Sequence, residues 1–187
     1  MSKKNVCVLI ADGSEEMEVV IVVDVLRRAG IGVFLAEVGE SRLVTTSRGV
    51  RIAPDGAWDP AEASRFDALV IPGGIGGTET MRADDSVKQT ARDFLKAGKL
   101  VAAICAGPTV LHAAGVLAGK TFTSHPNSRA ELPAGWVDRP VVRDGHLVTS
   151  QAPGTAFAFA LTLIEILDAP GTAAKVAAGM QYRGWNG

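Results

Sequence analysis

The sequence predicts one domain of the α/β class, a parallel sheet sandwiched between helices. Its 187 residues fit a single domain over 1–187. Hydrophobic residues make up 47% and charged residues 21%, which is typical of a globular protein. Short apolar runs of strand length alternate with longer helical patterns. This alternation is typical of βαβ units, whose central strands are buried on both faces.

The first part of the chain is predicted to form strand, helix and strand. Residues 6–11 are nearly all apolar, so we expect a buried strand. A helix over 15–29 follows, with Ser14 as its N-cap and Gly30 as its stop signal. Residues 32–37 are expected to form the second strand.

The first helix is apolar on nearly every side, and not along one stripe only. One face can pack on the sheet, and the other needs a second cover, so we expect a homodimer through this helix. Glu18 is an acid within that apolar run, close to the end of the first strand. It is either a buried carboxyl, protonated and able to donate its proton, or a solvated helix acid.

The middle of the chain is predicted to add further strands and a helix. We expect two short strands within 43–52 and a polar connection over 55–65. The apolar residues 66–71 should form a core strand that ends in a glycine-rich loop over 72–77. A helix is expected over 86–97.

A cysteine then follows an apolar strand and precedes a sharp turn. Residues 100–104 are continuously apolar, and Gly107 and Pro108 permit a tight turn into a helix. Cys105 is therefore expected at the carboxyl end of a central strand, in the arrangement of a nucleophile elbow. The neighbouring helix N-terminus should favour its thiolate. We interpret Cys105 as a nucleophile or redox thiol and Cys7, within a strand, as buried and inert.

The last part of the chain alternates in the same way. We expect a short strand over 121–123 and a hairpin over 141–148 with an Asp-Gly turn. An amphipathic helix over 150–167 and a final helix over 170–179 follow. The tail, 180–187, carries aromatic residues and is expected to dock on the rest of the protein.

Charge and motif content disfavour several classes of function. The formal net charge is −1, so nothing indicates a nucleic-acid or membrane partner. The histidines lack cysteine or carboxylate neighbours at metal-ligand spacing, so we predict no metal. Gly119-Lys120-Thr121 lacks the first P-loop glycine, and residues 73–77 do not match a dinucleotide fingerprint. We therefore predict no bound nucleotide.

The 2 cysteines are interpreted as free thiols, because a protein of this size does not need a single disulfide. The apolar run at 6–10 is too short for a secretory signal, and no stretch approaches the length of a membrane span. We therefore expect a cytoplasmic location.

Other positions are candidates for a site around Cys105. His125 follows a predicted strand on the cysteine side and is either a catalytic partner or an ordinary loop histidine. The backbone amides of Gly73, Gly74 and Ala106 are either oxyanion donors or parts of ordinary turns. The residues alone leave these alternatives open.

Several motifs, in order along essentially the whole chain, resemble the ThiJ/PfpI superfamily. Within it they are most similar to the Parkinsonism-associated, DJ-one-like branch and its bacterial relatives. The motifs are Asp12-Gly13-Ser14-Glu15-Glu16-Met17-Glu18, Pro72-Gly73-Gly74, Ala102-Ala103-Ile104-Cys105-Ala106-Gly107-Pro108, Thr123-Ser124-His125-Pro126 and Pro153-Gly154-Thr155.

The resemblance implies a flavodoxin-like fold, a homodimer with the first helix in the interface, and catalysis without a cofactor. It implies that Cys105 is the nucleophile, that Glu18 is its acid/base partner and that His125 lies nearby. The implied activity is a glyoxalase that converts methylglyoxal or glyoxal to lactate or glycolate. Deglycation of proteins and nucleotides, redox sensing and chaperone-like activity are further roles that the resemblance implies.

Some positions depart from the family's pattern. Ala106 stands where the protease-like branch carries its triad histidine, which argues against a peptidase. Thr46 and Ala53 stand where animal members have cysteines. Gln151 and Ala152 replace an arginine and a glycine at the expected mouth of the site.

We therefore predict a glutathione-independent glyoxalase, in which Cys105 attacks the aldehyde and Glu18 moves a proton, with His125 assisting. The amides of Gly74 and Ala106 are predicted to stabilise the developing oxyanion. The alternative is an oxidative-stress sensor or redox-regulated chaperone, in which protonated Glu18 holds a sulfinic acid on Cys105. Both functions use the same residues, so the sequence does not separate them.

Overall fold

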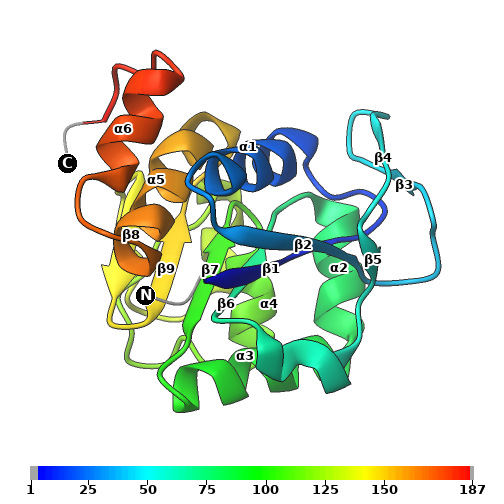
Figure 1. The fold of residues 1–187 in the computed structure, drawn as a ribbon. Coiled ribbons are helices and arrows are strands. Elements are labelled where there is room, and N and C mark those ends of the chain that lie inside the picture. The colour runs from blue at the N-terminus through cyan, green and yellow to red at the C-terminus, as the bar shows by residue number, and fades with distance from the viewer. Residues whose placement is uncertain (1–3, 186–187) are drawn as a thin grey trace.

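The protein is built around a seven-stranded sheet, seen in a computed structural model that describes residues 4–185 (Figure 1). The strands are β1 Asn5–Ile10, β2 Gly32–Glu37, β5 Gly56–Ala57, β6 Ala68–Ile71, β7 Leu100–Ile104, β8 Val141–Asp144 and β9 Leu147–Ser150. Their order is β5-β2-β1-β6-β7-β9-β8, and only the β8–β9 pair is antiparallel. The run β2-β1-β6-β7-β9 is the flavodoxin-like order, which confirms the predicted fold class.

Helices cover both faces of this sheet and complete the predicted three layers (Figure 1). The first layer holds α1 Glu16–Arg28, α5 Ala156–Leu167 and α6 Thr172–Gly179; the second holds α2 Ile75–Ala83, α3 Asp85–Lys96 and α4 Pro108–Ala113. Side chains of β1 alternate between the two cores, with Val6, Val8 and Ile10 in one and Cys7 and Leu9 in the other. A strand of this kind has no polar face, as its apolar sequence predicted.

A small hairpin packs beside the amino end of α1. It is formed by β3 Val44–Thr45 and β4 Arg51–Ile52, which confirms the strand pair predicted within 43–52. Glu16 of α1 holds this hairpin, because its carboxylate accepts hydrogen bonds from the Ser47 hydroxyl at 2.9 Å and the Arg48 backbone N–H at 3.1 Å. The hairpin and α1 therefore form one connected surface.

Three segments differ from the sequence-based expectation. The predicted loop over 72–77 ends early, because α2 begins at Ile75 and includes two glycines. The predicted connection over 55–65 contains β5 and a 3-10 helix, η1 Pro60–Arg65. The predicted strand over 121–123 is wrong, since only Phe122 forms a bridge, with Trp136. Further 3-10 turns are η2 Pro126–Glu131 and η3 Pro153–Thr155, the second of which leads into α5.

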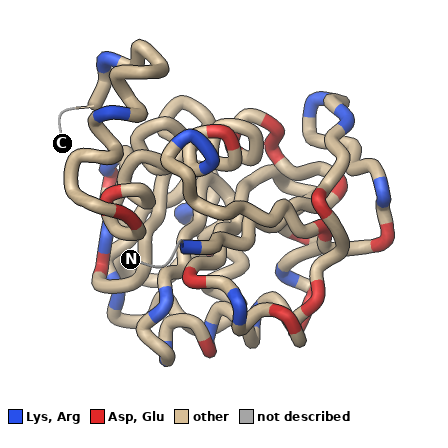
Figure 2. Tube along the Cα trace, in the orientation of Figure 1, with Lys and Arg blue, Asp and Glu red and all other residues tan. Residues whose placement is uncertain are grey.

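The predicted docking of the tail is confirmed up to Trp185; residues 186–187 lie outside the described part of the chain. Tyr182 stacks on Phe157 of α5 with ring centroids 5.2 Å apart. Trp185 is partly buried against the same core. Figure 2 shows basic and acidic positions interspersed along the chain, in keeping with the formal net charge of −1. Among the described helices, none has the length and apolarity that a membrane span requires.

Candidate active site

The carboxyl ends of three neighbouring strands bring the candidate residues together. Glu18 lies on α1, which follows β1; Gly73 and Gly74 follow β6; Cys105 follows β7. These strands are adjacent and parallel, so their carboxyl ends share one edge of the sheet. The order of the sheet reverses between β1 and β6, which is the usual ligand-binding crevice of such folds.

Cys105 occupies a sharp turn between β7 and α4, as the sequence predicted. Its backbone φ is 63°, a left-handed conformation that is uncommon for a residue with a side chain. The Cys105 backbone N–H donates to the Ser150 carbonyl at 3.0 Å, and Gly107 donates to Ile104 at 2.8 Å. A side chain at Gly107 would place its Cβ 2.5 Å from the Ile71 carbonyl oxygen. The neighbouring strands therefore hold the strained turn in place.

Glu18 is completely buried, which settles the choice between a buried and a solvated carboxyl. Its Oε2 accepts a hydrogen bond from the Gly73 backbone N–H at 2.6 Å. A Cβ added at Gly73 would lie 2.7 Å from this Oε2 and 2.9 Å from the Cys105 Sγ. A larger residue at this position would therefore push the carboxyl or the sulfur aside, and the small size of glycine lets the two lie close together.

Burial raises the pKa of Glu18 to about 8, and the charge of nearby Glu15 adds to this effect. Hydrogen bonds from the Gly73 amide and the Cys105 thiol act in the opposite direction and lower that pKa. The carboxyl is therefore largely protonated at neutral pH, as a proton donor must be.

The sequence predicted that the Cys105 thiolate would form easily. This prediction is wrong when the neighbouring Glu18 is charged. Burial raises the pKa of Cys105 to about 12, and the negative charge and hydrogen bonding of Glu18 raise it further. Hydrogen bonds from the Ala106 and Gly74 amides act in the opposite direction. Because protonation of Glu18 removes the repulsive charge, the thiolate forms most easily when the carboxyl holds a proton.

The predicted oxyanion donors both lie beside the sulfur. The backbone N–H groups of Ala106 and Gly74 are within hydrogen-bonding reach of the Cys105 sulfur. The Gly73 N–H, which was also considered, is already bonded to Glu18. Gly74 and Ala106 therefore have the amides that can face an oxygen on a molecule bound to this sulfur.

His125 is connected to Cys105 through the backbone. Its N–H donates to the Cys105 carbonyl at 2.9 Å. The half-buried ring accepts a hydrogen bond at Nδ1 from the Asn127 N–H, at 3.2 Å. With Nδ1 as an acceptor, the neutral ring carries its proton on Nε2, which can act as a donor.

Glu15 is the residue that the sequence analysis missed. It is the N-cap of α1, since its Oε2 accepts from the Glu18 backbone N–H at 2.8 Å. The prediction of Ser14 as cap is wrong, because the buried Ser14 hydroxyl accepts from the Ala11 N–H instead, at 3.0 Å. The sequence did contain a signal for this cap, because Glu15 is an acid three residues before Glu18, the spacing at which a cap side chain accepts from a helix N–H.

Cys7 is completely buried within β1, as predicted. Burial raises the pKa of Cys7 to about 12. Both cysteines are free thiols. Within residues 4–185, no group of three histidine, cysteine or acidic side chains is placed to hold a metal ion.

Comparisons with known proteins show which family this chain belongs to. The profile of the DJ-1/PfpI family matches residues 4–166. Protein dj-1beta of Drosophila melanogaster is 42% identical over 95% of this chain and 96% of its own. The crystal structure of Drosophila melanogaster DJ-1beta matches with a TM-score of 0.90 at 43% identity, over 96% of this chain and 98% of that one.

Two further matches carry information in their names. The glutathione-independent glyoxalase DJR-1.2 of Caenorhabditis elegans is 36% identical over 90% of each chain. The structure of oxidized DJ-1 from Toxoplasma gondii has a TM-score of 0.91 and 37% identity, over 96% of this chain and 99% of that one. With a family match over most of its length and relatives near 40% identity at almost full coverage, the chain belongs to the DJ-1/PfpI family, in its DJ-1 branch.

Proposed function

We propose that this protein is a glutathione-independent glyoxalase that converts methylglyoxal and glyoxal to lactate and glycolate. The observation that carries the proposal is the buried Glu18 carboxyl, held by the Gly73 amide against the sulfur of Cys105. An acid with a pKa of about 8 beside a thiol supplies both a nucleophile and a proton carrier. The name of the Caenorhabditis elegans relative supports the same activity.

In the first step, the Cys105 sulfur attacks the aldehyde carbon of methylglyoxal, and the C–S bond forms as the carbonyl electrons move to oxygen. Glu18, which is protonated in the free protein, gives its proton to that oxygen, and the thiol proton leaves to solvent, so the products are a neutral hemithioacetal and a Glu18 carboxylate. The amides of Gly74 and Ala106 stabilise the negative charge that this oxygen carries during the attack. A soft sulfur nucleophile reacts readily with aldehydes, so this step needs no further reactant.

In the second step, the Glu18 carboxylate removes the hydrogen from the former aldehyde carbon, which gives an enediolate. The hydroxyl proton of that carbon passes to the former ketone oxygen, and Glu18 returns its proton to the neighbouring carbon, so the ketone becomes a hydroxyl and the first carbon becomes a thioester. His125 Nε2 donates to the ketone oxygen. Water then cleaves the thioester, which releases lactate and restores the Cys105 thiol.

In an adduct of these aldehydes with an amino group, the sulfur can replace the nitrogen: the C–S bond forms, the C–N bond breaks, and the thiol proton leaves on the released amine. Glycated proteins and nucleotides are therefore included in the proposed substrate class. No nucleic-acid surface is involved, since the substrate would be the adduct itself. Two free cysteines suit the reducing conditions of the cytoplasm, where we expect the protein to act.

The test is lactate formation from methylglyoxal without glutathione, by wild type and by Cys105→Ser. We expect lactate from wild type and at least a thousandfold less from the variant, on the order of the losses seen when a nucleophile is removed. Circular dichroism and size-exclusion chromatography control for an unchanged fold. Lactate from the variant at a wild-type rate would refute the mechanism.

A second candidate function is the sensing of oxidative stress, with redox-regulated chaperone activity. The observation in its favour is that Glu18 Oε1 is buried without a hydrogen-bond partner among the described residues. When protonated, it has a donor for an oxygen added to the neighbouring sulfur by peroxide. Mass spectrometry after mild peroxide treatment, in the absence of lactate formation, would favour this function over the first.

We also propose that a second copy of this chain covers the outer face of α1. Met17 and Val20 on this helix are 52% and 50% exposed, and Val50 of the adjoining hairpin is 50% exposed. Exposed apolar side chains that adjoin one another are typical of an interface. Light scattering should show a dimer that Val20→Lys weakens, whereas Glu79→Lys on the opposite layer should leave it intact.

A further inference from the structure

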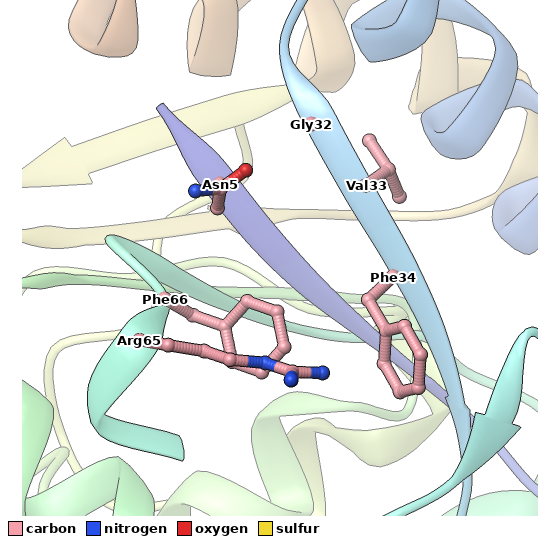
Figure 3. A pocket seen from close by; sticks show the side chains of 6 residues that line it. All are labelled: Asn5, Gly32, Val33, Phe34, Arg65 and Phe66. Carbon is pink, nitrogen blue, oxygen red and sulfur yellow. The ribbon is translucent and has the colours of Figure 1, made fainter. Parts of the chain in front are cut away.

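A pocket, called the hollow below, lies at the opposite edge of the sheet from Cys105. It has a volume of about 310 Å³ and is lined by Asn5, Gly32, Val33, Phe34, Arg65 and Phe66 (Figure 3). Asn5 and Gly32 begin their parallel strands, whereas Cys105 follows the carboxyl end of its strand. This hollow is therefore separate from the candidate active site, and its chemistry does not depend on the proposed glyoxalase activity.

Arg65 is the cation of this hollow. Its guanidinium lies 5.1 Å from the ring centroid of Phe34 and 4.8 Å from that of Phe66. Figure 3 shows the guanidinium extending from the side of Phe66 towards Phe34. The two rings stack on each other with centroids 6.0 Å apart, and a Cβ at Gly56 would lie 2.9 Å from the Phe34 ring. The aromatic surfaces and the charge are therefore positioned before any ligand arrives.

Within residues 4–185, Arg65 forms one ion pair, with Glu62, and this pair is weak enough for a ligand to replace Glu62. Glu62 accepts from the guanidinium at 3.0 Å, and the two side chains are 48% and 56% exposed. Exposed pairs of this kind contribute about 0.2–1 kcal/mol. A ligand carboxylate can take the place of Glu62 and bind the planar guanidinium with two hydrogen bonds.

We propose that this hollow, defined by Arg65, Phe34, Phe66, Val33 and Asn5, binds a small aromatic carboxylate. The carboxylate pairs with the Arg65 guanidinium, and Asn5 lines the rim beside Gly32. The ring of the ligand packs on Val33 and Phe34. A volume of about 310 Å³ admits a single-ring molecule and little more.

The experiment is a titration of the ¹⁵N-labelled full-length protein with phenylacetate, followed by amide chemical shifts. We expect saturable shifts at Gly32, Val33 and Phe34, with a Kd on the order of 1 mM for so small a ligand. The neutral isostere phenylacetamide should bind at least about tenfold more weakly, because it lacks the charge that Arg65 recognises.

Variants of Arg65 and Glu62 show how far phenylacetate binding depends on the charge of the guanidinium and how far on its planar shape. Arg65→Gln should weaken phenylacetate binding by at least about tenfold, and Arg65→Lys should give an intermediate Kd because it keeps the charge without the planar fork. Glu62→Gln should tighten binding about two- to fivefold by removing the competing carboxylate. Arg82→Gln, which removes a similarly exposed arginine from a surface ion pair with Glu131, should bind like wild type.

The amide spectra also show whether each variant is folded. Wild-type affinity in a folded Arg65→Gln variant would overturn the proposal, as would equal binding of phenylacetamide. Shifts confined to the amides of Gly73 and Gly74 would place the ligand at the other site and would also overturn it.

Discussion

The two cysteines of this protein belong to the same central sheet, Cys7 within β1 and Cys105 directly after β7, yet only one is placed for chemistry. Cys7 lies within a strand, completely buried, and its backbone is regular. Cys105 lies one residue beyond a strand, partly exposed, with φ at 63°. Burial raises the pKa of both thiols to about 12, so acidity does not separate them. The difference lies in what surrounds Cys105: a carboxyl that holds a proton, two amides and access to solvent.

The largest expected difference is in alkylation by iodoacetamide. Cys105 should react in the native protein, whereas Cys7 reacts only through opened states, whose populations are about 10⁻³–10⁻⁶. Peptide mapping should therefore give a rate ratio of at least about a thousandfold. Denaturant should abolish the difference, and comparable alkylation rates of the two thiols in the native protein would contradict it.

Glu18→Gln should lower glyoxalase turnover by about 10²–10⁴-fold, because the amide cannot carry the proton between the two carbons. The variant preserves an oxygen that can accept from the Gly73 N–H, so the fold should be retained. Lactate production at saturating methylglyoxal measures the effect. A loss of less than about threefold would remove Glu18 from the acid/base role.

The same variant tests protonation through stability. The pKa of Glu18 in the folded state, about 8, is above its unfolded value, so the folded protein binds the extra proton. Unfolding free energy should therefore decline from about pH 4.3 to pH 8, by about 1.4 kcal/mol for each unit of difference between the two pKa values. Urea melts across this range should show the decline in wild type and a flatter profile in Glu18→Gln.

Gly73→Ala should reduce turnover by about 10- to 100-fold, because its Cβ would lie 2.5 Å from the Cys105 Cβ and must push the sulfur or Glu18 aside. Gly179→Ala is the matched control, since an added Cβ there has no neighbour within 4 Å. Initial rates of the two variants, measured together, isolate the effect of the close approach. Equal rates for the two variants would show that turnover does not depend on the close approach of the Cys105 sulfur and the Glu18 carboxyl.

The smallest effect is expected at the inert cysteine. Cys7→Ala should lower the free energy of unfolding by about 1 kcal/mol, a typical loss for a small deletion in a core, and leave turnover unchanged. Cys7→Ser should lower it further, because a buried hydroxyl would lack a partner. Denaturant midpoints and lactate assays measure both quantities. A loss of turnover in a stable Cys7 variant would show that Cys7, like Cys105, is needed for activity.

Sequence patterns predicted the parts of the site that depend on local order. An apolar run followed by Gly107 and Pro108 indicated the turn at Cys105, whereas for Glu18, an acid among apolar residues, a buried and a solvated carboxyl both stayed open. The start of α2 was missed because Gly76 and Gly77 favour loops locally. The fold overrides this preference, since a Cβ at Gly77 would lie 2.3 Å from the Ser14 hydroxyl.

The acidity of the Cys105 thiol was not predictable in the same way. A helix N-terminus is visible in sequence, but α4 has only 6 residues, and burial acts against it. The charge facing the sulfur comes from Glu18, which is far away along the chain. Such a property depends on the packing of distant segments, which no local pattern contains.

The complete burial of Glu18 has a consequence for isotopes. A proton that the carboxyl takes from substrate exchanges slowly with solvent, so the hydrogen removed from one carbon is the hydrogen delivered to the next. In heavy water, the lactate formed from ordinary methylglyoxal should therefore retain protium at its second carbon. Because a single carboxyl on one side of the intermediate makes the delivery, that lactate should also be a single enantiomer.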